Sequence, residues 1–116
     1  MTMAKADRLA RLDDRRIEAE TEYHTLLHDA LQRTAAGQLR LFGHGKDKAQ
    51  LAKAAPTIAE LTELGESVDS LRDQLSLEPF ALHARFLASR GAVSAHAVGE
   101  AKQAQAWLDH WTETPA

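Results

Sequence analysis

The sequence predicts an all-α fold: a helical bundle built on a long antiparallel helix pair, with two shorter C-terminal helices packed across it. Apolar residues recur three and four positions apart over long segments, which is the spacing of amphipathic helices. The 116 residues include 22 Ala and 16 Leu but only two Ile and three Val, whereas strands favour β-branched residues. At this length we expect one domain over residues 1–116.

The first segment predicts a helix over about residues 4–36, because it contains neither Pro nor Gly and Gly37 follows it. Its core-facing stripe has a regular spacing of three and four and consists of Leu9, Leu12, Arg16, Ala19, Tyr23, Leu26 and Ala30. This helix is long for such a small domain, so part of the stripe should need a partner to cover it.

A second long helix is predicted over about residues 57–75. Thr57 and Glu60 match a capping box, in which each side chain accepts a hydrogen bond from the other's backbone N–H. Its apolar seam comprises Leu61, Leu64, Val68, Leu71 and Leu75. The opposite side carries Glu60, Glu63, Ser67, Ser70 and Gln74. This side is either a solvated outer face or an acidic docking face for a basic partner.

The remaining segments complete the predicted bundle. Residues 37–56 should form an irregular basic connection that ends at Pro56, with a weak helical turn or two over residues 46–55. A third helix is expected over about residues 78–90, with Pro79 in its first turn and Gly91 after its end. A last helix should begin between residues 94 and 100 and end near Trp111, and residues 112–116 should form a frayed tail.

Composition excludes several classes of protein. The chain has no Cys, so disulfides and thiolate metal sites are impossible. A formal charge of −3 gives no general attraction to nucleic acid or anionic lipid. No window approaches the ~20 apolar residues of a membrane span, and the charged N-terminus does not resemble a signal peptide. We therefore expect a cytoplasmic protein that does not enter the membrane.

Glu20, His24 and His28 form the main candidate site for a metal ion. They are spaced four apart along one helix row, and two imidazoles at that spacing can approach one divalent ion. However, the Glu-x-x-His motif of two-metal bundles is missing from the chain, and Glu60 and Glu63 point away from the seam. We expect a surface row with no metal and keep metal binding as the alternative.

Arg16 and Glu20 stand four apart on the apolar face, where Leu would be expected. A buried ion pair costs desolvation, and it specifies register or partner more often than it adds stability. The other interpretation is a pair at a solvated end of the bundle.

Other motifs are incomplete. The loop around Gly45 and Lys46 lacks the first Gly, the Ser or Thr and the preceding strand of a phosphate-binding loop. Residues 79–105 have helix and turn lengths similar to those of a helix-turn-helix. However, the second helix offers only Lys102 for phosphate contacts. DNA binding through this segment is a second alternative, and on these grounds we do not expect a nucleic-acid partner.

The sequence therefore predicts a non-catalytic helical interaction or regulatory module that associates with itself or with another helical protein. No residue is assigned a catalytic role, and no cofactor is expected. Apolar side chains of the seam and the two tryptophans are the interface candidates: Leu9, Leu12, Tyr23, Leu61, Leu64, Trp107 and Trp111.

Overall fold

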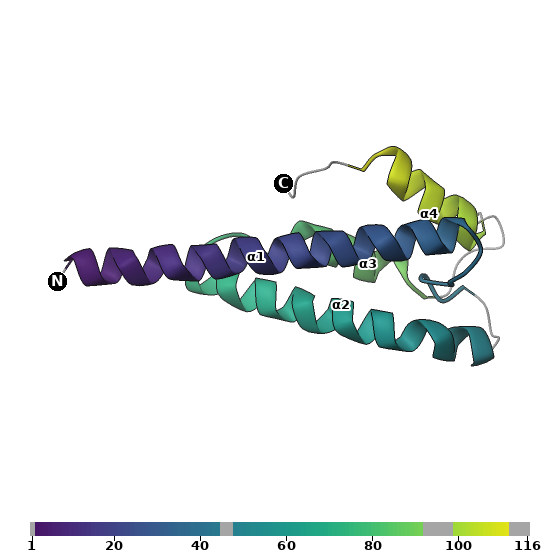
Figure 1. Cartoon of the computed structure of the whole chain (residues 1–116), viewed down its shortest axis with the longest axis horizontal. Helices are drawn as coiled ribbons and strands as arrows, with labels where there is room; N and C mark the ends of the chain where they lie inside the picture. The colour runs from purple at the N-terminus through teal and green to yellow at the C-terminus, as the bar shows by residue number, and fades with distance from the viewer. Residues whose placement is uncertain (1, 45–47, 92–98, 112–116) are drawn as a thin grey trace.

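The computed structural model describes residues 2–44, 48–91 and 99–111, and its regular structure in these ranges is helical. The helices are α1 (Thr2–Ala35), α2 (Lys48–Gln74), α3 (Ala81–Ser89) and α4 (Glu100–Asp109). α2 runs back along α1 in the opposite direction (Figure 1). α4 packs against α1, and α3 packs against α2. The predicted all-α bundle on a long antiparallel pair is confirmed.

The core lies along the contact between α1 and α2. It continues at the end of this contact where the loop after α1 begins. α1 contributes Tyr23, Leu27, Ala30 and Leu31, all fully buried, and α2 contributes Ala54, Leu61 and Val68. The loop after α1, the short helices and the segments beside them close the core with Leu39, Leu41, Phe42, Phe80, Phe86 and Ala104. The first turns of α1 extend past the end of α2 and lie outside this core (Figure 1).

Both long helices end in the same hydrogen-bonded motif. After α1, Gly37 has a φ of +79°, its N–H donates to the Thr34 carbonyl, and the Gln38 N–H donates to the Arg33 carbonyl. This is the Schellman arrangement, which satisfies carbonyls that the last turn leaves unpaired. α2 ends in the same way, with Ser76 (φ 57°) in the position that glycine usually takes.

The second long helix begins much earlier than the sequence indicates. α2 starts at Lys48, so Pro56 lies inside it and Thr57 is a mid-helix residue. The expected capping box is therefore wrong. The helical turns expected before Pro56 are part of α2, and the expected break at Pro56 is wrong. A proline removes one backbone donor and leaves the carbonyl of Ala52 without its helical partner. Since Ala52 and Pro56 are both exposed, water can reach that carbonyl.

The C-terminal helices are shorter than expected. α3 begins at Ala81, and Pro79 precedes it rather than standing in its first turn. α4 begins at Glu100, the later end of the expected range, and ends at Asp109. The frayed tail expected at residues 112–116 lies outside the described residues. None of the helices in the described ranges combines the length and apolarity that a membrane crossing requires.

Candidate functional site

Glu20 is the centre of a buried ion network between the two long helices. Its side chain is 4% exposed and accepts hydrogen bonds from Arg16 on its own helix and from Arg72 on α2, the latter at 2.6 Å. Arg16 also pairs with Asp13 at 2.7 Å. The hydrogen bond to Asp13, together with the charge of Glu20, raises the pKa of the Arg16 guanidinium, although desolvation acts against it. The network fixes the register of α1 against the last turn of α2.

The row of Glu20, His24 and His28 does not act as one site. Glu20 is hydrogen-bonded to its two arginines, whereas both imidazoles pack at a tilt against Trp111, with ring centroids 4.5 Å and 5.1 Å away. His24 is buried and His28 is half-buried. Across the part of the chain that the structure describes, no three His, Cys, Asp or Glu side chains are grouped so that they could hold a metal ion.

The interface candidates divide into core and surface. Tyr23 and Leu61 are fully buried within the chain and cannot contact a partner. Leu64, Trp107 and Trp111 are partly buried against the core, and Trp107 also lies under the Arg85 guanidinium, 5.0 Å from the ring centroid. Leu12 is half-buried, and Leu9 keeps 41% of its surface exposed. The candidates that remain accessible are therefore Leu9, Leu12, Leu64 and the two tryptophans.

The segment compared with a helix-turn-helix has a different arrangement in the described residues. α3 packs on α2 and α4 packs on α1, so the two helices contact different parts of the bundle. Glu100 is the first residue of α4 and is buried, where it binds the chain itself. Residues 94–98 of the expected recognition helix lie outside the described residues.

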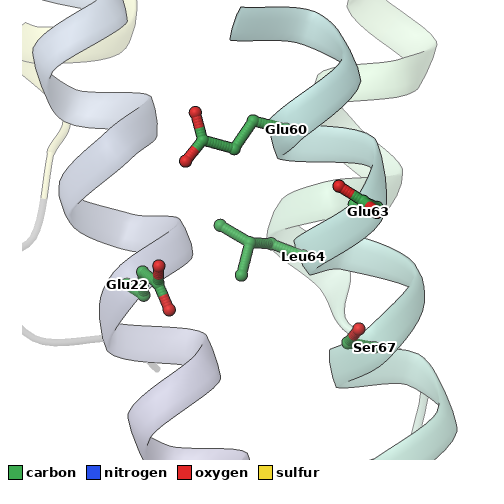
Figure 2. A pocket seen from close by; sticks show the side chains of 5 residues that line it. All are labelled: Glu22, Glu60, Glu63, Leu64 and Ser67. Atoms are coloured by element: carbon green, nitrogen blue, oxygen red, sulfur yellow. The ribbon is translucent and has the colours of Figure 1, made fainter.

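Two open hollows lie along the junction of α1 and α2, and we call this junction the groove. The first, about 270 Å³, is lined by Glu22 of α1 and by Glu60, Glu63, Leu64 and Ser67 of α2. Figure 2 shows Glu60 and Leu64 reaching from α2 toward α1, with Glu22 across from them. The second hollow, about 330 Å³, lies nearer the N-terminus and is lined by Arg8, Arg11, Leu12 and Arg15 of α1 and by Gln74 of α2. The groove is thus acidic at one end and basic at the other.

Tyr23 and His83 form a polar contact inside the core. The Tyr23 hydroxyl and His83 Nδ1 are hydrogen-bonded at 2.7 Å, and both residues are buried. Burial raises the pKa of the Tyr23 hydroxyl and lowers the pKa of His83, although Asp69 and Glu66 act against the second shift. The imidazole also covers Gly65 of α2, where an added methyl group would overlap His83 Cδ2. The contact holds α3 against the long helices. Because both side chains are buried, a substrate cannot reach them.

Glu100 holds the loop after α1 in place. Its Oε1 accepts a hydrogen bond from the backbone N–H of Phe42 at 2.7 Å, and its Oε2 accepts one from Arg40 at 3.0 Å. Arg90 donates to the carbonyl of Leu41, and Gly91 donates to the carbonyl of Phe42. These bonds satisfy a buried loop backbone, which is a structural role.

Sequence reasoning missed several of these residues. Arg72 as the second partner of Glu20 could not be predicted without the register of the two helices. His83 was visible only indirectly, because a glycine within a helix pattern, here Gly65, can indicate a close approach by another group. The acidic side of α2 was recognised, but not the position of Glu60 and Glu63 beside Glu22 of α1.

Comparisons of the chain with protein-family models, with curated proteins and with solved structures find no match.

Proposed function

We propose that this chain is a non-catalytic helical interaction module that associates with a second copy of itself through the start of α1. We call residues 5–15 of α1 the N-terminal arm. One observation carries the proposal: α1 continues past the end of α2 while its core-facing stripe goes on, so that Leu9 and Leu12 have no complete cover (Figure 1).

An arm of this kind gains from a partner. Isolated helical segments of ~12 residues are marginal in water, and most of their stability comes from packing an apolar face. A second helix pair laid against the arm would cover Leu9 and Leu12 and extend the bundle. The groove favours a second copy as that partner, because its acidic hollow complements the arginines of the arm.

Sedimentation velocity over a concentration series tests the proposal. We expect the parent protein to pass from monomer to dimer as its concentration rises. The variant with Leu9→Gln and Leu12→Gln should stay monomeric, since Gln preserves helix propensity but removes the apolar contact.

A variant with Leu51→Gln and Leu87→Gln provides the matched control. These leucines lie on α2 and α3 and are 37% and 47% exposed, similar to Leu9. The control should dimerise as the parent does, and circular dichroism should show the same helical signal for all three proteins. A parent protein that remains monomeric up to its solubility limit would contradict the proposal.

A further inference from the structure

The face of α1 beside the groove changes sign along its length. Arg8, Arg11, Arg15, Glu18 and Glu22 follow a spacing of three and four, which places them in one row, and all five are exposed. The first three are positive and the last two negative. On the neighbouring rows, Asp7 and Asp14 are also exposed, so the reversal belongs to this row and not to the whole arm.

A matching row on α2 lies along the other side of the groove. Glu60, Glu63, Ser67, Ser70 and Gln74 have the same spacing and are exposed. Glu60 and Glu63 share the acidic hollow with Glu22, whereas Gln74 shares the basic hollow with the three arginines. The two rows therefore border the groove, with the negative charges at its first hollow and the positive charges at its second.

We infer that two copies pair antiparallel, with the arm of each seated in the acidic hollow of the other. The inference rests on the proposed self-association and specifies its geometry. A twofold axis between Arg15 and Glu18 brings each copy's Arg15 to Glu18 of the second copy and each Arg11 to its Glu22. Arg8 then lies over the hollow that Glu60 and Glu63 line. A twofold contact uses the same patch on both copies, which a face carrying its own complement satisfies.

The same arrangement brings apolar side chains together. Leu12 lines the basic hollow and Leu64 lines the acidic hollow, and both are half-buried in the single chain. When the arm of one copy lies in the groove of the second copy, Leu12 of the first lies beside Leu64 of the second. A parallel pairing would instead place arginines against arginines and glutamates against glutamates, which opposes it.

Two charge variants test this geometry. The first carries Arg11→Glu and Arg15→Glu, so that its row is acidic from residue 11 to residue 22. The second carries Glu18→Arg and Glu22→Arg, so that its row is basic throughout. Since every change acts twice in a symmetric dimer, each variant alone should have a dissociation constant at least ~30-fold above that of the parent. An equimolar mixture should form a heterodimer, because all four pairs are then complementary.

A control variant separates paired contacts from net charge. Lys48→Glu with Lys102→Glu gives the same change of net charge as the acidic variant, at exposed positions on α2 and α4. It should dimerise as the parent does. Circular dichroism should show unchanged helical content in every variant.

The outcomes distinguish this inference from the proposed function. A parent dimer with failed self-pairing of both variants and a heterodimer on mixing supports the antiparallel geometry. A parent dimer with either variant dimerising normally, or with no heterodimer on mixing, overturns the geometry and leaves self-association standing. A monomeric parent overturns both.

Discussion

At the scale of single residues, the contact of His83 with Gly65 and Tyr23 shows how one polar side chain positions a helix. α3 is short, and its buried residues are His83 and Phe86. Gly65 allows the imidazole to approach the α2 backbone, and Tyr23 provides it with a hydrogen-bond partner from α1. Three helices are thereby connected through one buried ring, so changes at this point should affect stability more than changes at the surface.

Gly65→Ala should destabilise the protein by about 1–3 kcal/mol, because the new methyl group overlaps the His83 ring and overpacks the core. Urea denaturation at a fixed protein concentration measures this change. In a His83→Ala background the overlap is removed, and the same substitution should be neutral or stabilise by up to ~1 kcal/mol through helix propensity. A similar cost in both backgrounds would contradict the described contact.

His83 should also make stability depend on pH. Burial lowers its pKa in the folded protein, so below about pH 6.5 the unfolded chain takes up a proton that the native protein resists. The free energy of unfolding should therefore decrease as pH falls below that value, by at most ~1.4 kcal/mol per pH unit from this residue. Tyr23 is hydrogen-bonded to the ring, and the charges of Asp69 and Glu66 act to raise the pKa of His83 and so moderate the effect.

The difference between the parent and His83→Gln isolates this contribution from that of the other five histidines. The parent should lose more stability than the variant between pH 7 and pH 5. Parallel curves for the two proteins would show that His83 is not the responsible group.

The next prediction concerns the buried charge of Glu20. Glu20→Ala should destabilise by about 2 kcal/mol, less than for a fully buried pair, because Arg16 and Arg72 keep 19% and 16% of their side chains exposed. Asp14→Ala, an exposed control on the same helix, should change stability by no more than ~0.5 kcal/mol. Thermal or urea unfolding distinguishes the two, and equal small effects would contradict the network.

At the scale of helices, the sequence predicts ends best where one residue type dictates the backbone. Gly37 marked the end of α1, and its positive φ explains why. The start of α2 was misplaced, because Pro56 commonly stops a helix whereas here its missing hydrogen bond falls on the solvent side. The Arg16–Glu20 pair was visible from its spacing, but Arg72 depends on packing between helices. Interactions within one helix can be predicted from a single sequence, whereas the register between two helices cannot.

Ser76→Gly tests the end of α2. Ser76 has a left-handed backbone with a φ of 57°, a conformation that glycine adopts without the steric cost of a Cβ. The substitution should stabilise by about 0.5–1 kcal/mol after the entropy of the unfolded glycine is included. Chemical denaturation measures the gain, and a loss of stability would mean that α2 does not end in this motif.

At the scale of the whole molecule, the unequal lengths of the two long helices determine what the surface offers. The sequence indicated that part of the first helix would lack a helix packed against it. In the structure, this uncovered part is the N-terminal arm (Figure 1). The charge reversal along the groove was not predictable, since it depends on two rows of side chains meeting across a helix pair. A self-complementary face is what leads us to a second copy as the partner.

The antiparallel dimer is tested most directly by distances between spin labels. Because the chain has no Cys, one cysteine at Thr21 or at Gln32 gives a single labelled site on each copy. Both positions are exposed on α1. About a twofold axis between Arg15 and Glu18, the label separation grows by about 3 Å for each residue away from the axis, twice the helical rise. Since the two sites are 11 residues apart on the same helix, we predict a separation larger by roughly 33 Å at Gln32 than at Thr21. Equal separations at the two sites, or no dipolar coupling at either, would contradict the account.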